Sequence, residues 1–162
     1  MISKGRQKIK SKDFNDAIKL FSEILENLDK ANSDAIFYRA ISYLDQGNLQ
    51  QAINELWQVI NSQSVEAHEI ELSQQAYVLL SIAHKRLGEI QNAIQDLEQC
   101  IEKYPSYPDA YLARGQTLLL QEEFTLALAD FQKFLSLNHN SFSGYLGVGD
   151  CHKANKNFDE AT

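Results

Sequence analysis

The sequence predicts an all-α fold built from repeated pairs of helices. Three observations support this prediction: the chain repeats itself with a near-constant period, apolar residues recur at helical spacing within each repeat, and turn-forming residues are scarce. The 162 residues include only 7 Gly and 2 Pro, too few for the many tight turns of a sandwich or barrel. This length is enough for one domain, or a short array of repeats, with its own core.

The period is clearest at one alanine position. Ala93, Ala127 and Ala161 recur at a constant spacing of 34, and Ala17 and Ala52 keep the same register with a spacing of 35. From Ala52 to Ala93 the spacing is 41, so seven additional residues are present there. We therefore expect a single array of repeats at residues 1–31, 34–64, 74–107, 108–141 and, in part, 142–162, with an inserted helical extension at 65–73.

The first two repeats each predict two helices. In repeat 1–31 a first helix begins almost at Met1, and Phe14, Phe21 and Ile24 mark the apolar stripe of a second helix. In repeat 34–64 the break between the helices falls at Gly47, which has the same register as Gly88 in the next repeat. Glycine is a helix C-cap signal because it adopts the left-handed conformation at little cost.

The inserted residues predict a longer first helix in repeat 74–107. Seven residues make about two helical turns, and Ser64 is a competent N-cap. We expect this helix to begin at about residue 65 and to end near Leu87, with Trp57 packed under the added turns. The second helix of this repeat should end at Tyr104, because the residue before Pro105 is pushed out of helical geometry.

The last two repeats differ in completeness. In repeat 108–141 a first helix should begin at Pro108, since proline is tolerated in the first helical turn. The partial repeat 142–162 has a first helix containing Tyr145 and Gly149, and Phe158 would begin a second helix that is essentially absent. We expect either that the chain is a fragment of a longer protein or that association covers this end.

These repeats resemble the tetratricopeptide repeat, a unit of the same period with the pattern W-x2-L-G-x2-Y…A-x3-F…P. The resemblance implies a right-handed α-solenoid of antiparallel helix pairs, with three full repeats between two partial ones. It also implies a non-catalytic protein-interaction scaffold, whose first helices line a concave groove for a peptide or a partner helix. In repeat 108–141 the matching residues are Tyr111, Gly115, Leu118, Ala127 and Phe131, with His139 in place of the proline.

The expected groove is apolar rather than charged. Some members of the family bind acidic C-terminal tails through a clamp of Lys, Asn and Arg side chains, and the corresponding positions here carry mostly apolar residues. We expect shape and apolar burial to dominate binding, although about half of the wall could be inter-repeat core. The expected groove residues are Phe37, Tyr38, Ile41, Leu44, Val78, Leu79, Ile82, Lys85, Arg86, Leu112, Gln116 and Leu119.

A second hypothesis is a structural self-assembly module that stacks through the open C-terminal end. Tyr145, Leu146 and Val148 lie on the first helix of the partial repeat, which has no partner helix of its own. A second copy of the chain covering this face would give a homo-oligomer, because exposed apolar surface favours association.

The charge distribution argues against nucleic-acid binding. The formal net charge is −7, and five positive residues in the first twelve leave −12 over residues 13–162. A duplex or RNA binder needs a basic surface to neutralise phosphates, and this body would repel them. No apolar run is long enough to span a membrane.

The residues that could carry chemistry have simpler explanations. His84 and His152 occupy equivalent inward positions two repeats apart and are expected to be core histidines, and Cys100 an inert buried thiol. No catalytic motif, phosphate-binding glycine loop or metal-ligand spacing is present, so we expect no catalytic residue, no metal and no cofactor. Two distant cysteines and no glycosylation sequon favour a cytoplasmic location.

Overall fold

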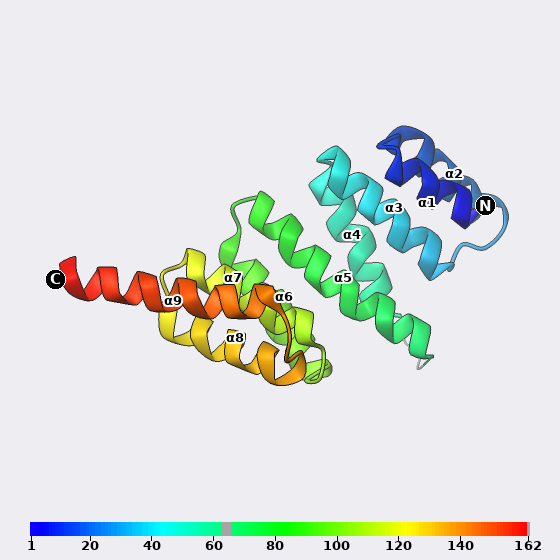
Figure 1. Cartoon of the computed structure of the whole chain (residues 1–162). Coiled ribbons are helices and arrows are strands. Elements are labelled where there is room, and N and C mark those ends of the chain that lie inside the picture. The colour runs from blue at the N-terminus through cyan, green and yellow to red at the C-terminus, as the bar shows by residue number, and fades with distance from the viewer. Residues whose placement is uncertain (63–65, 162) are drawn as a thin grey trace. The chain divides into compact units, whose positions relative to one another are not determined.

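The computed structural model describes residues 1–62 and 66–161, with side chains described as far as Lys156. These residues form nine helices. Within residues 1–89, and again within residues 90–162, successive helices pack against each other in antiparallel fashion (Figure 1). The all-α prediction is therefore confirmed. The helices are α1 (Ile2–Lys10), α2 (Phe14–Asn27), α3 (Ser33–Gln46), α4 (Leu49–Ile60), α5 (Ala67–Arg86), α6 (Ile90–Lys103), α7 (Pro108–Leu120), α8 (Phe124–Leu137) and α9 (Phe142–Ala161).

The chain forms two compact units, residues 1–89 and 90–162, which we call the first and second unit. The first unit contains α1 to α5 and the second contains α6 to α9. Over the described residues, no helix combines the length and the hydropathy that crossing a bilayer requires.

The turns that join paired helices share one backbone geometry. Lys12, Gly47, Gly88 and Glu122 occupy equivalent places, and their φ angles are 60°, 88°, 81° and 61°. After each of them, the next backbone N–H donates a hydrogen bond of 2.8–3.0 Å to a carbonyl five residues earlier. This is the Schellman arrangement, which satisfies the free carbonyls at the end of a helix. The predicted break at Gly88 is confirmed.

Small residues on the first helices allow close approach of the second helices. A Cβ atom on Gly5 would lie 2.5 Å from the ring of Phe21, and one on Gly115 would lie 3.0 Å from the ring of Phe131. Both rings are almost fully buried. The alanines that defined the period, Ala17, Ala52, Ala93 and Ala127, are all completely buried, which explains why the register is strict at this position.

Helix α5 carries the predicted extension. It has 20 residues, against 14 in α3 and 13 in α7. The helix begins at Ala67, slightly later than predicted, and Glu66 occupies the N-cap position. Ser64, the predicted cap, lies outside the described residues. Trp57 makes an edge-to-face contact with Tyr77 in α5, at 6.3 Å between ring centroids, and its packing under the added turns stays a prediction.

Helix α9 differs from the predicted layout. A break before Phe158 was expected, and α9 instead continues without a turn from Phe142 to Ala161 (Figure 1). Lys156 has the register of the left-handed turn residues but is helical here. Among the described residues no paired helix follows α9, so no packing interaction requires the chain to turn at this point.

Candidate functional site

Two residues expected in the groove wall belong to the core. Phe37 is 2% exposed and Leu44 is 3% exposed, so neither can contact a partner directly in this structure. Both lie on α3, where their side chains are enclosed by the helices of the first unit. The prediction that they line the binding surface is therefore wrong, because their apolar side chains hold the helices together.

Tyr38 joins three helices of the first unit. Its ring stacks on Phe21 from α2, with 6.0 Å between the centroids, and the Arg6 guanidinium from α1 lies 4.8 Å from the ring centroid. The side chain is half-buried. These contacts fix α1 and α2 against α3.

Five of the remaining groove residues of the first unit form a partly exposed, mostly apolar surface. They lie on α3 and α5, two helices that contact each other. All of them are half-buried, which is the exposure expected of a surface that still has area to bury. We call this surface the α3–α5 face; its residues are Ile41, Val78, Leu79, Ile82 and Lys85.

Lys85 is the polar member of the α3–α5 face. No hydrogen bond or ion pair within the described residues reaches its ammonium group, and burial lowers the pKa of this side chain. A half-buried cation without a counter-ion is costly, because desolvation is not offset by an opposite charge. A carboxylate placed beside it would remove this cost.

Arg86 was expected at the rim of the groove and has a structural contact. Its Nη1 donates a 2.7 Å hydrogen bond to the backbone oxygen of Leu44, in the last turn of α3. A cation at this point also interacts favourably with the negative end of the helix dipole. Arg86 thus connects the C-terminal end of α5 to that of α3.

The extension of α5 makes a polar contact with the start of α3. The Nε2 atom of His68 lies 3.1 Å from Oδ2 of Asp34. The hydrogen bond to the Asp34 carboxylate raises the pKa of His68, and its negative charge adds to this effect. The residues added to α5 therefore bring a titratable group into contact with the start of α3.

In the second unit, the expected groove residues lie on α7. Leu112 and Leu119 are half-buried and pack against a core cluster that contains Leu118 and Phe131, while Gln116 is exposed. Part of this apolar surface is therefore already used in folding. The alternative interpretation of these positions as inter-repeat core describes Leu112 and Leu119 better than Gln116.

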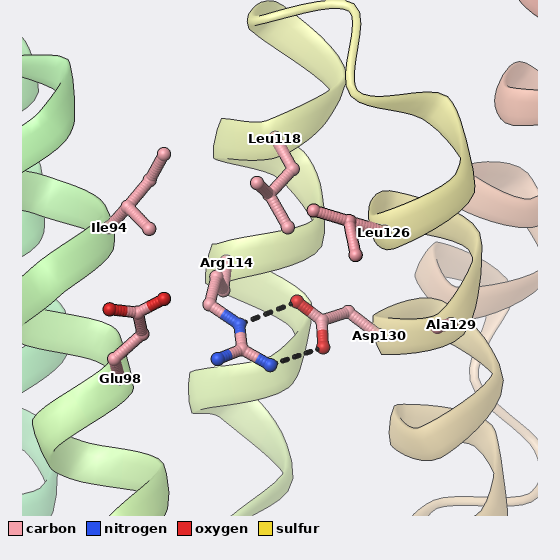
Figure 2. A pocket seen from close by; sticks show the side chains of 7 residues that line it. All are labelled: Ile94, Glu98, Arg114, Leu118, Leu126, Ala129 and Asp130. Carbon is pink, nitrogen blue, oxygen red and sulfur yellow. Dashed lines mark hydrogen bonds and ion pairs between the residues drawn. The ribbon is translucent and has the colours of Figure 1, made fainter.

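A buried ion pair in the second unit was not predicted from the sequence. Arg114 donates two hydrogen bonds to Asp130, from Nε to Oδ2 at 2.8 Å and from Nη2 to Oδ1 at 2.7 Å (Figure 2). The pair borders a cavity of about 190 Å³, into which Glu98 also points. Contact with Asp130 raises the pKa of Arg114, and Asp130 itself is almost fully buried.

An equivalent pair of an arginine and a carboxylate occurs in the first unit. Arg39 donates a 2.7 Å hydrogen bond from Nε to Oε1 of Glu55, and a 3.0 Å bond from Nη1 to Ser22. Burial raises the pKa of Glu55, although contact with Arg39 opposes this shift. In both repeats an arginine on the first helix precedes an acid on the second, with a sequence separation of 16. This shared spacing is the sequence signal from which the two ion pairs could have been predicted.

The exposed surface at the start of α9 is more apolar than predicted. Tyr145 is 61% exposed and Leu146 is 51% exposed, as the self-association hypothesis requires. Val148 points the other way and packs against the core cluster of Phe131, so its assignment to this surface was wrong. Phe142, one turn earlier, was missed and is 79% exposed.

The cysteine and histidine side chains singled out in the sequence lie in different environments. Cys100 is fully buried, and burial raises the pKa of its thiol to about 12. His84 is half-buried, whereas His152 is exposed, so the prediction of a core histidine is wrong for His152. Among the residues that the structure describes, no cluster of His, Cys, Asp and Glu could hold a metal ion.

Comparisons with known proteins agree with the repeat architecture. A family model described as "Tetratricopeptide repeat" matches residues 3–60 and 78–141. The chain is 33% identical over 132 residues to human tetratricopeptide repeat protein 13, an alignment that covers 78% of this chain and only 14% of that protein.

Two solved structures illustrate the structural likeness. A crystal structure of the MamA protein superposes with a TM-score of 0.71 at 25% identity, covering 97% of this chain and 81% of the other. The first tetratricopeptide domain of Spaghetti (RPAP3), bound to the HSP90 peptide SRMEEVD, superposes with a TM-score of 0.64 at 19% identity, covering 75% and 91% of the two chains. The family match covers more than half of the chain and agrees with its repeats and helix pairs, so the chain belongs to the tetratricopeptide-repeat family.

Proposed function

We propose that this chain is a non-catalytic protein-interaction module that binds an apolar peptide or amphipathic helix on its first helices, chiefly at the α3–α5 face. The observation that carries the proposal is the half-buried state of Ile41, Val78 and Ile82 on two contacting helices. Each has apolar area left to bury, and an extended or helical peptide can bury it without changing the fold. Members of the tetratricopeptide-repeat family are typically interaction modules and not catalysts.

Lys85 specifies the chemistry of the ligand further. Because its ammonium group is half-buried and has no partner among the described residues, a ligand that brings one Asp or Glu beside it gains an ion pair at little additional desolvation cost. The preferred ligand is therefore an apolar segment with one acidic residue. Arg86, the other cation expected in the groove, has a different role, because its guanidinium already donates a hydrogen bond to the backbone oxygen of Leu44.

The HSP90 peptide bound by the Spaghetti domain is strongly acidic, and a chain that bound such a tail through a charged clamp would need several cations. Lys85 is the only cation of the α3–α5 face as defined above. We therefore infer that apolar burial supplies most of the affinity here and that Lys85 selects among apolar ligands.

A peptide selection tests this proposal. A random 12-residue library is selected against the whole chain, and the affinities of the enriched peptides are measured by calorimetry. We expect enriched peptides to be apolar with one acid. Ile82→Glu should weaken them at least about tenfold, because it places a charge on the apolar contact surface. Leu120→Glu is the matched control, since Leu120 is exposed in the second unit and lies off this face.

Two results would overturn the proposal. One is that affinity falls equally with Leu120→Glu and Ile82→Glu, which would indicate a non-specific effect of charge. The other is that enriched peptides bind equally well to wild type and to a variant carrying both Ile41→Glu and Ile82→Glu. Circular dichroism of each variant shows whether the helices are intact.

A further inference from the structure

The exposed face of α9 lacks the cover that the equivalent face of α7 has. Tyr111 on α7 and Tyr145 on α9 both donate a hydrogen bond to a carbonyl six residues earlier, at 3.1 and 3.2 Å, so their local geometry is the same. Tyr111 is 7% exposed, whereas Tyr145 is 61% exposed. The difference comes from α8, which packs on α7 and has no counterpart on α9 among the described residues.

Glycine positions show what kind of side chain covers such a face. Gly5 and Gly115 each receive a phenylalanine ring from the paired helix, at distances that leave no room for a Cβ atom. Gly149 has the same register as Gly115, one repeat later, and nothing lies within 4 Å of its Cβ position. Gly149 is therefore an open notch of the shape that holds a phenylalanine ring elsewhere in this chain.

The face of α9 carries a matching ring as well as the notch. Phe142 lies seven residues, or about two turns, before Gly149, so both point to the same side of the helix. Phe142 is 79% exposed. If two copies of α9 pair in antiparallel fashion with Phe142 opposite Gly149 of the other copy, then the twofold axis passes between Tyr145 and Leu146. The two remaining exposed apolar residues of the face then meet at the axis.

We propose that α9 is a homodimerisation surface, in which Phe142 of each copy enters the Gly149 notch of the other across a twofold axis at Tyr145 and Leu146. In this interface, α9 of the second copy packs on α9 in the way that α2 packs on α1 and α8 packs on α7, with a phenylalanine ring against a glycine. A twofold arrangement suits it, because the same patch supplies both the ring and the notch.

Charges do not oppose this register. In the antiparallel pair, Asp150 of one copy lies about 13 Å along the helix axis from Asp150 of the other copy, at a rise of 1.5 Å per residue. The corresponding separation between the two Lys153 residues is about 22 Å. Each chain nevertheless has a net charge of −7, so the two bodies repel at long range. Salt screens this repulsion, and dimerisation should therefore strengthen as ionic strength rises.

The area indicates a weak, reversible dimer. Two aromatic side chains and one leucine per copy bury on the order of a few hundred Å², below the roughly 1,200 Å² at which stable complexes begin. The association should therefore appear in the micromolar to millimolar range, and measurements must reach about 1 mM chain.

Sedimentation equilibrium of the whole chain tests the proposal. Phe142→Ala removes the ring, and Gly149→Ala fills the notch without meeting any atom of the same chain. Each should weaken dimerisation at least about fivefold. Leu120→Ala removes an exposed apolar side chain of the second unit that is not on α9, and it should leave dimerisation unchanged.

Disulfide cross-linking tests the register. Leu146→Cys places a thiol next to the twofold axis and should give a covalent homodimer on mild oxidation. Lys153→Cys lies on the same helix, too far from its copy for a disulfide bond, and should not. Cys100 and Cys151 are buried and do not interfere.

The proposal fails if the wild-type chain stays monomeric up to about 1 mM. It also fails if a dimer forms with unchanged affinity in both Phe142→Ala and Gly149→Ala, or if Lys153→Cys cross-links in preference to Leu146→Cys. Helical content by circular dichroism, compared between the variants and wild type, separates loss of dimerisation from loss of structure.

Discussion

The ring of Phe131 fills the space in front of Gly147, where a Cβ atom would lie 2.5 Å from Cε1. The same ring also contacts Gly115, where a Cβ atom would lie 3.0 Å away. One side chain of α8 therefore packs against both neighbouring helices, α7 and α9. This relationship explains why glycine is tolerated within two helices despite its low helix propensity.

Gly147→Ala should destabilise the chain. The added methyl group cannot fit against the ring of Phe131 without moving it, and such overpacking typically costs about 1–3 kcal/mol. Urea unfolding followed by circular dichroism measures the change. Gly149→Ala, two residues away on the same helix, meets no atom and should instead stabilise by up to about 1 kcal/mol through helix propensity. Equal effects of the two substitutions would contradict the packing described here.

Removing one member of the Arg114–Asp130 pair should cost more than removing both. Arg114→Met leaves the buried Asp130 carboxylate without its two hydrogen bonds, and we expect a loss of about 3 kcal/mol. The double variant with Asp130→Leu should recover most of that loss, because no buried charge then remains unpaired. A double-mutant cycle in urea measures the coupling. Additive effects of the two substitutions would show that the pair contributes no coupling energy.

The sequence was sufficient to predict the parts of the fold that depend on local chemistry. The alanine register located the second helices α2, α4, α6 and α8, because Ala17, Ala52 and their equivalents in α6 and α8 are completely buried. The break at Gly88 and the start of α7 at Pro108 followed from backbone preferences of single residues.

The composition of the binding surface was harder to predict. Periodicity shows which side of a helix is apolar, but it does not show whether a neighbour already covers that side, so Phe37 was assigned to the surface although it is buried. The contact of Arg86 with Leu44 joins residues that are 42 positions apart, and no local pattern encodes it. The continuous α9 was missed because the helix break was inferred from repeat equivalence alone.

Arg86 and Lys85 are adjacent in sequence and should behave in opposite ways. Arg86→Ala removes the hydrogen bond to Leu44 at the end of α3 and should lower the free energy of unfolding by about 1 kcal/mol. Lys85→Met removes a half-buried cation whose pKa is lowered by burial, so stability should stay the same or rise. Chemical denaturation of both variants distinguishes them. A larger loss for Lys85→Met would show that Lys85, and not Arg86, stabilises the first unit.

The His68–Asp34 contact should make the start of α5 sensitive to pH. The pKa of His68 is raised above its ordinary value of 6.5 by Asp34, so the folded state binds the proton more tightly than the unfolded state does. The stabilisation is fully present below pH 6.5 and is lost as the pH rises through the raised pKa. Both side chains are substantially exposed, so solvent screening makes the effect small.

Titration by NMR measures this contact directly. We expect His68 to titrate above its ordinary pKa and to return toward it in Asp34→Asn. Backbone amides in the first turn of α5 should exchange faster with solvent above the His68 pKa than below it. No change in the His68 pKa on Asp34→Asn would contradict the contact.

Glu122→Gly should stabilise the chain. Glu122 holds a φ angle of 61° at the turn between α7 and α8, in the place where Gly47 and Gly88 sit in other repeats. A side chain with a Cβ atom pays a conformational cost in this region that glycine avoids, and the cost outweighs the additional freedom that glycine gives the unfolded chain. We expect a gain of about 0.5–1 kcal/mol in the free energy of unfolding, measured by urea denaturation. Glu123→Gly is the matched control: it removes a neighbouring carboxylate with the same net change in charge, at a residue whose φ is −83°, and should destabilise. If both glycine variants lost stability, the left-handed conformation at Glu122 would not be a source of strain, and the equivalence of the four turns would be limited to their hydrogen bonds.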